Sequence, residues 1–125
     1  MESRNFTRIT TTHKVSVVDE AGNEHTGLMR NASLGGLFVT GIVLPTDAKV
    51  TVAIVLSEEV RIDARGHVAR SEADGVGIAV DLLEDSESYV HLQRLILLNT
   101  RTDEQTKSVG EEIESNRAMK IVPPT

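Results

Sequence analysis

Short runs in which apolar and polar residues alternate occupy most of the chain. In the first, Lys14 to Asp19, Val15 and Val17 alternate with polar neighbours, a pattern with period two that predicts a half-buried strand. The turn sequence Ala21-Gly22-Asn23 follows, and a second run from His25 to Arg30 is expected to pair back as a hairpin. Four more runs predict further strands: Leu37 to Val43, Val50 to Leu56, Val60 to Val68, and Val76 to Leu82.

Six short strands, each with one apolar face, predict a small antiparallel barrel or sandwich. The chain contains only two phenylalanines and one tyrosine, so Val, Ile and Leu must fill the core. Closure of the sheet removes the unpaired edges that a sandwich would leave. We therefore predict an all-β fold, a six-stranded antiparallel β-barrel, followed by one or two helices.

The pattern becomes helical after the sixth run. Asp85 or Ser86 can cap a helix, and the apolar residues that follow at spacings of three and four would pack it against the barrel. These apolar residues are Tyr89, Leu92, Leu95, Ile96 and Leu98.

The rest of the chain is charged and poor in apolar residues. A second short helix is expected from Glu104 to Arg117, weakened by Gly110, with a loose tail from Val122 to Thr125. The expected organisation is a barrel with an N-terminal arm and a packing helix over residues 1–100, and a charged extension over residues 101–125.

Composition excludes several classes of function. The 125 residues suffice for one domain, and the absence of cysteine excludes disulfides, thiolate zinc sites and cysteine nucleophiles. A net charge of −6 argues against long nucleic acids and anionic membranes as main partners. With no apolar stretch long enough for a membrane helix and no signal peptide, we expect a cytoplasmic protein.

A basic segment precedes the first strand. Arg4 and Arg8 are four residues apart, and each guanidinium can bind a phosphate or the O6/N7 edge of guanine with two hydrogen bonds. The same spacing recurs at Arg61 and Arg65 on the solvated face of a strand, so the pair alone does not decide the function. Residues 1–18 nevertheless carry a local charge of +2, which suits a small anionic ligand.

The sequence Asn31-Ala32-Ser33-Leu34-Gly35-Gly36 lies between the second and third predicted strands. The Asn31 amide can pair with the Watson–Crick edge of guanine, and the Ser33 hydroxyl can bond to a phosphate or a base. Gly35 and Gly36 would supply backbone conformations closed to other residues and leave room for a ligand. The same residues would equally form a turn stabilised by Asn or Ser, with glycines at positive φ.

Taken together, these two segments resemble the signature of the PilZ domain family, Arg-x-x-x-Arg on an N-terminal loop plus Asp/Asn-x-Ser-x-x-Gly. Two downstream runs, Gly66 to Arg70 and Gly75 to Val80, look like the closing hairpin of that family, and the resemblance covers roughly residues 2 to 100. The matching signature residues are Arg4, Arg8, Asn31, Ser33 and Gly36.

The resemblance implies that the protein binds cyclic di-GMP, without a cofactor, and that a mobile arm closes over the ligand. Arg4 and Arg8 would clamp guanine edges and phosphates, while Asn31 and Ser33 would hold one guanine. Gly36 would keep the surface clear. The secondary candidates are Gly35 and Arg70.

Two departures from the family pattern bear on binding. Ser3 stands where many members carry a further arginine, which favours one ligand molecule per site. No tryptophan lies near Val68, so stacking on guanine would fall to arginine.

An enzyme is the weakest reading of the sequence. The histidines, His13, His25, His67 and His91, show no metal-ligand spacing, and nothing in the spacing of Ser33, His67 and Asp81 supports a catalytic triad.

Two other classes remain open: a PilZ-like adapter that binds protein and no nucleotide, and a barrel that binds single-stranded RNA, which the acidic composition disfavours. We expect no DNA or RNA partner and no membrane insertion. The expected partners are cyclic di-GMP and a protein effector in a motility, chemotaxis or exopolysaccharide system, with the protein a monomer or weak homodimer.

Overall fold

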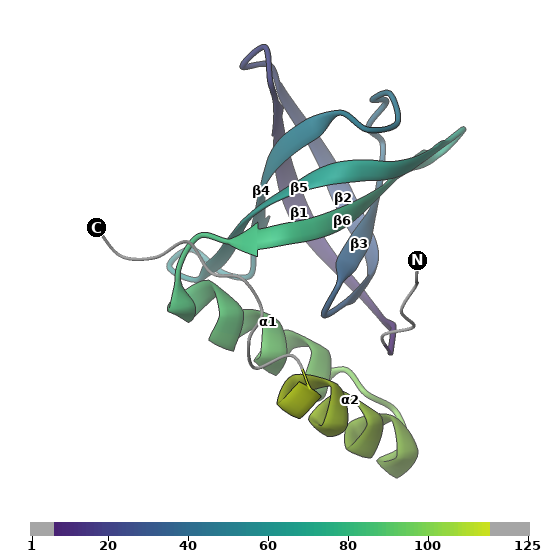
Figure 1. Ribbon diagram of the computed structural model, residues 1–125, viewed down its shortest axis with the longest axis vertical. Helices are drawn as coiled ribbons and strands as arrows, with labels where there is room; N and C mark the ends of the chain where they lie inside the picture. Colours follow the sequence, from purple (N-terminus) through teal and green to yellow (C-terminus); the bar gives the residue numbers. More distant parts are fainter. Residues whose placement is uncertain (1–6, 116–125) are drawn as a thin grey trace.

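Six antiparallel strands form a closed barrel in the computed structural model, which describes residues 7–115. The strands follow one another around the barrel in the order β1-β2-β3-β6-β5-β4 (Figure 1). This confirms the predicted fold class. The strands are β1 (Ile9–Asp19), β2 (Glu24–Ser33), β3 (Gly36–Thr40), β4 (Lys49–Val55), β5 (Arg61–Glu72) and β6 (Gly75–Leu83).

Aliphatic side chains fill the barrel, as the composition predicts. Alternate residues of each strand point inward, which gives β4 its buried Val50, Val52 and Ile54 between exposed or half-buried neighbours. The β-branched residues suit these positions because their side chains pack well on a pleated surface.

Several strand boundaries differ from the prediction. β2 ends at Ser33 instead of Arg30, so Asn31 and Ser33, expected in the connection after this strand, lie within it. β5 ends at Glu72 instead of Val68. β1 begins at Ile9 instead of Lys14, so Arg8 immediately precedes a strand and is not separated from the barrel by irregular chain. β3 ends at Thr40 instead of Val43, because Gly41 follows with φ +87° and turns the chain out of the sheet. Ile42 and Leu44, beyond this turn, still join the core.

Helix α1 (Ser86–Leu98) packs on the barrel as predicted. Asp85 is its N-cap and accepts a hydrogen bond from the Ser88 backbone N–H at 2.7 Å. The Ser88 hydroxyl in turn accepts one from the backbone N–H of Asp63 in β5 at 2.9 Å, which ties the helix to the sheet. Four of the five predicted apolar contacts are buried; Leu98 is 82% exposed, so its predicted packing role is wrong.

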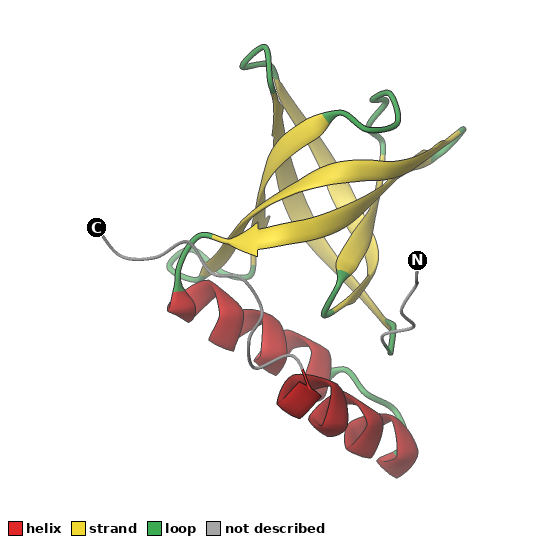
Figure 2. Cartoon of the chain, viewed as in Figure 1, coloured by secondary structure: helices red, strands yellow, loops and turns green. Residues whose placement is uncertain are grey.

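Helix α2 (Asp103–Ser115) runs beside α1, and both helices lie at one end of the barrel (Figure 2). Val109 is fully buried and Ile113 packs against the core, so α2 is attached to the domain through these side chains. It begins one residue before the predicted Glu104 and continues through Gly110. Arg117 and the predicted tail from Val122 to Thr125 lie outside the described residues. Within residues 7–115, no helix is long and apolar enough to cross a membrane.

Candidate functional site

Arg8 and Asn31 meet on the outer face of the barrel. β1 and β2 pair with Thr10 opposite Asn31, and this register brings the start of β1 beside the end of β2. Arg8 Nη1 donates a hydrogen bond to Asn31 Oδ1 at 2.6 Å. Two residues that stand 23 positions apart, one from each predicted motif, are therefore in direct contact.

Irregularities in the sheet surround this contact. The β1–β2 register shifts between Thr10 and His13, and the β2–β3 register shifts between Met29 and Asn31. The second shift leaves Arg30 as an extra residue, so that Arg30 and Asn31 together face Phe38 of β3. Such β-bulges redirect side chains and are common beside functional sites.

Phe38 forms a covered aromatic platform on this face. Its neighbours Leu37 and Val39 belong to the barrel core and Phe38 does not, so strand alternation directs its ring outward. The ring is nevertheless fully buried, because the guanidinium of Arg30 lies 4.4 Å from its centroid and that of Arg70 lies 5.5 Å away. These are cation–π distances, and they hold both arginines against the sheet.

Arg70 also acts on Arg8. Partial burial and, second, the positive charge of Arg70 lower the pKa of the Arg8 guanidinium. Arg70 comes from β5 opposite Gly77, and a Cβ at Gly77 would lie only 3.1 Å from the Arg70 side chain.

The face thus gathers guanidinium groups from three separate segments. Carboxylates remain at its rim: Glu72 accepts from Arg70 at 2.7 Å and Asp74 from Arg30 at 3.0 Å.

The Ser33 side chain takes part in the β2–β3 turn. Its hydroxyl accepts a hydrogen bond from the Gly35 N–H at 3.2 Å, and Ser33 is only 4% exposed. The Gly36 carbonyl lies 3.5 Å from the same hydroxyl, which is long for an O–H···O bond. Ser33 therefore stabilises the turn, the second of the two readings the sequence allows, while its own proton has no strong acceptor there.

The two glycines of this turn do not have the backbone conformation expected from the sequence. Within residues 7–115 the glycines at positive φ are Gly22 and Gly41, so that expectation for Gly35 and Gly36 is wrong. Gly36 is needed for a different reason. A Cβ there would lie 2.3 Å from the carbonyl oxygen of Ile78, so only glycine lets β3 approach β6 this closely.

The structure thus brings together Arg8, Asn31 and Arg70, with Ser33 two residues along β2. Arg4 lies outside the described residues. Sequence reasoning missed Arg30 and Phe38. The outward direction of Phe38 could have been predicted from the apolar run Leu37-Phe38-Val39, because alternation in a strand places Phe38 on the face opposite its two neighbours.

The model of the PilZ domain family matches residues 2–98 of this chain. The chain belongs to the PilZ domain family. Two solved structures show the same fold. An inhibitor of motility from Bacillus subtilis (MotI/DgrA) superposes with a TM-score of 0.62 at 22% identity; the match covers 82% of this chain and 55% of that one. The PilZ domain of CeSA from a cellulose-synthesizing bacterium gives a TM-score of 0.50 at 19% identity, covering 89% and 98% of the two chains. No curated protein matches.

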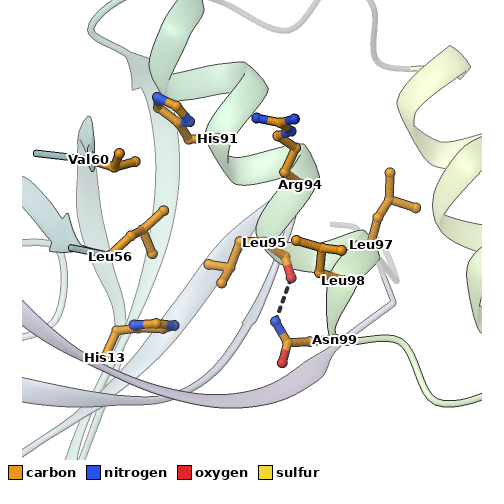
Figure 3. A pocket seen from close by; sticks show the side chains of 9 residues that line it. All are labelled: His13, Leu56, Val60, His91, Arg94, Leu95, Leu97, Leu98 and Asn99. Atoms are coloured by element: carbon orange, nitrogen blue, oxygen red, sulfur yellow. Dashed lines mark hydrogen bonds between the residues drawn. The ribbon is translucent and has the colours of Figure 1, made fainter.

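This PilZ domain has a groove between α1 and the barrel. The groove has a volume of about 580 Å³, and Figure 3 shows its side chains, with His13, Leu56 and Val60 from the barrel side and the rest from α1 and its C-cap. Asn99 closes the helix by donating to the Leu95 carbonyl at 2.8 Å (Figure 3). The lining is mainly aliphatic and includes the exposed Leu98.

A histidine–aspartate pair lies elsewhere on the PilZ barrel. His67 Nδ1 is 2.9 Å from Asp81 Oδ2, and both side chains are well exposed. Ser33, the third residue of the triad considered from the sequence, has its hydroxyl engaged in the β2–β3 turn. Among residues 7–115 no group of three or more metal-ligating side chains comes together. PilZ domains are typically receptors or adapters and not enzymes, and this pair is a surface interaction between neighbouring strands.

Proposed function

We propose that this PilZ domain is a receptor for cyclic di-GMP, and that it binds the dinucleotide on the face formed by Arg8, Asn31 and Arg70. PilZ domains generally bind this ligand and act as adapters. The observation that carries the proposal is the Arg8–Asn31 contact beside Arg70. It places a guanidinium pair and an amide, the groups that recognise phosphate and guanine, on one surface.

The charge on this face suits a ligand with two phosphates. Bringing Arg70 near Arg8 disfavours the charged form of Arg8, and a bound anion relieves that repulsion. Guanidinium planes also stack on purines, so Arg70 can take the place of the missing tryptophan. Arg4, four residues before Arg8, is proposed to close over the ligand from the N-terminal arm.

Asn31 and Ser33 are proposed to hold one guanine from the barrel side. Asn31 Oδ1 accepts from Arg8, which leaves the Nδ2 amino group to donate to a base. Ser33 can offer its hydroxyl proton to a ligand while it still accepts from Gly35. Gly35 and Gly36 then act by shaping the turn that presents Ser33.

Isothermal titration of the full chain with cyclic di-GMP tests the proposal. We expect saturable binding with about one ligand per chain. Binding should be abolished or weakened at least about tenfold in Asn31→Ala, because this variant loses both the proposed bond to guanine and the bond that holds the charged Arg8. Asn23→Ala, in the β1–β2 turn, is the matched control and should bind like the wild type. GTP and a short single-stranded RNA should give no comparable heat. A flat trace with cyclic di-GMP would overturn the assignment.

Signalling through this domain requires a protein partner, and we propose that the liganded arm and barrel form its docking surface. Motility and exopolysaccharide systems are the proposed settings: the fold is shared with an inhibitor of motility and with a PilZ domain from a cellulose-synthesizing bacterium. We place this activity in the cytoplasm. A pull-down with and without cyclic di-GMP tests it, and the captured partners should change with the ligand.

The second candidate function is an adapter that binds protein without nucleotide. The aliphatic groove beside α1 favours it, because Leu98 is an exposed apolar residue at its edge (Figure 3). In that case the partners captured would be the same with and without ligand, and Leu98→Ser would release them while Asn31→Ala would not.

A further inference from the structure

Helix α2 binds the first described residue of the chain. The Thr7 backbone N–H donates a bifurcated hydrogen bond to the Glu112 carboxylate, at 3.1 Å to Oε1 and 3.0 Å to Oε2. The Thr7 hydroxyl donates to Glu112 Oε2 at 2.6 Å and lies 3.0 Å from the Ser108 hydroxyl. Ser108 also donates to Glu112 Oε2 at 3.1 Å, which fixes the orientation of the carboxylate.

These contacts join the two ends of the described chain. Thr7 and Glu112 are 105 positions apart, and Thr7 is the residue before Arg8. The acceptor is a carboxylate, and hydrogen bonds to ionised groups are shorter and about twice as strong as neutral ones. Thr7 is therefore held in place immediately before Arg8.

The helix that provides this carboxylate is itself fixed. Ser108 and Glu112 are four residues apart and so lie on one face of α2, next to the buried Val109 and the core-packed Ile113. The family match ends at residue 98, before α2 begins at Asp103. The contact to Thr7 is thus made by a segment outside the matched PilZ region.

We propose that Glu112 and Ser108 are positioning residues for the ligand-binding arm. By fixing Thr7, they keep Arg8 against Asn31 before cyclic di-GMP arrives, and so reduce the conformational entropy that residues 7 and 8 lose on binding. Glu112 binds the backbone and hydroxyl of Thr7, whereas the Arg8 guanidinium binds Asn31, so the anchor and the proposed ligand face use different groups of the arm. The identity of the ligand in this inference rests on the proposed function. The anchor, by which we mean the hydrogen bonds from Thr7 to Glu112 and Ser108, does not depend on it.

Hydrogen exchange of the full chain without ligand tests the anchor. In Glu112→Gln we expect the Thr7 amide to exchange at least about tenfold faster than in the wild type, the effect of losing a hydrogen bond to a charged acceptor. Glu114→Gln, which removes the same charge from an exposed position of the same helix, should leave Thr7 protection unchanged. Equal protection of Thr7 in the wild type and Glu112→Gln would overturn the inference, whatever the ligand.

Titration with cyclic di-GMP then tests the effect on binding. We expect the Kd to rise about five- to thirtyfold in Glu112→Gln, the range for freeing roughly one residue of backbone, and to stay unchanged in Glu114→Gln. The melting temperature separates this effect from partial unfolding, because a Kd change caused only by loss of fold would come with a large fall in melting temperature. Unchanged or tighter binding in Glu112→Gln would overturn the positioning role. If the wild type itself gives no binding, the proposed function is wrong. The exchange experiment then still shows whether Glu112 holds Thr7 in place.

Discussion

Arg8 is held where its positive charge is disfavoured. Partial burial and the nearby Arg70 lower its pKa, and its hydrogen bond to Asn31 does not neutralise it. Arg65, by contrast, has a carboxylate partner in Glu84 at 2.7 Å, and this contact raises the pKa of Arg65. The lowered pKa of Arg8 supports its proposed role in binding an anion.

Replacing Arg8 by alanine should therefore affect binding far more than folding. We expect Arg8→Ala to weaken cyclic di-GMP binding by about tenfold or more, the cost of losing charge-assisted hydrogen bonds. The free energy of unfolding should change by less than about 1 kcal/mol, because the lost Asn31 contact is offset by relief of the repulsion from Arg70. Calorimetric titration and urea unfolding measure the two effects, with Arg65→Ala, which breaks an exposed ion pair, as the control that should keep binding. Wild-type affinity in Arg8→Ala would remove this residue from the site.

Asp19 gives the β1–β2 hairpin a defined dependence on pH. Hydrogen bonds from His25 at 3.0 Å and from the backbone N–H groups of Asn23 and Ala21 lower the pKa of its carboxyl group. Because the folded pKa is depressed, this stabilisation is complete above the unfolded value of about 3.9 and is lost as pH falls through the lower folded pKa. The advantage of the wild type over Asp19→Asn should thus be constant from about pH 5 to 6 and shrink toward about pH 3. Thermal melts across this range measure it; a difference that grows on acidification would contradict the sign.

The residues of the proposed site differ in how far the sequence alone could predict them. Arg8, Asn31 and Ser33 belong to a recognisable spaced motif, and pairing of β1 with β2 explains why the spacing brings Arg8 to Asn31. The Thr7–Glu112 contact could not be predicted, because no local pattern encodes a hydrogen bond between residues 105 positions apart. Alternation encodes the direction of the Phe38 ring. Its cover by Arg30 and Arg70 depends on two register shifts, the one in β2 at Arg30 and another in β5 between Val68 and Arg70.

At the level of elements, the alternating pattern predicted the fold class but not the residues at which the strands begin and end. Alternation of aliphatic and polar residues predicted all six strands because one face of each packs into the barrel. The early start of β1 at Ile9 could not be read from Ile9-Thr10-Thr11-Thr12-His13, which contains a single apolar side chain and a register shift. This extension matters for the proposed function, because it places Arg8 directly before the first residue of the barrel.

The approach of β3 to β6 depends on a glycine. In Gly36→Ala the new methyl group would lie 2.3 Å from the Ile78 carbonyl oxygen, a backbone atom that cannot move without disturbing the Gly36–Ala79 pairing. We expect a loss of roughly 1–3 kcal/mol in the free energy of unfolding, typical of overpacking. In Gly110→Ala nothing lies within 4 Å of the new methyl group, and helix propensity should add up to about 1 kcal/mol of stability. Urea unfolding measures both. Equal stability of Gly36→Ala and the wild type would show that the strands can separate without cost.

The whole molecule combines a net charge of −6 with a cationic face at the start of β1. The acidic remainder, including the five carboxylates of α2, would repel the many phosphates of a long nucleic acid. A dinucleotide meets only the local face. We therefore expect selectivity for a small anion from where the charges lie, which the net charge alone does not reveal.

Ligand binding should therefore stabilise the whole domain selectively. A ligand that binds only the folded state adds about 2.7 kcal/mol at a concentration one hundred times its Kd, which for a domain of this size raises the melting temperature by several degrees. We expect this shift with cyclic di-GMP and none with an equal phosphate concentration of a 20-nucleotide single-stranded DNA. Arg8→Ala should abolish the shift, whereas Arg61→Ala, an exposed arginine of β5, should retain it. Differential scanning fluorimetry measures all four cases. Equal shifts with the dinucleotide and the DNA would contradict this prediction. They would mean that the face binds phosphate without recognising the dinucleotide, and that the acidic residues elsewhere on the domain do not repel the longer nucleic acid.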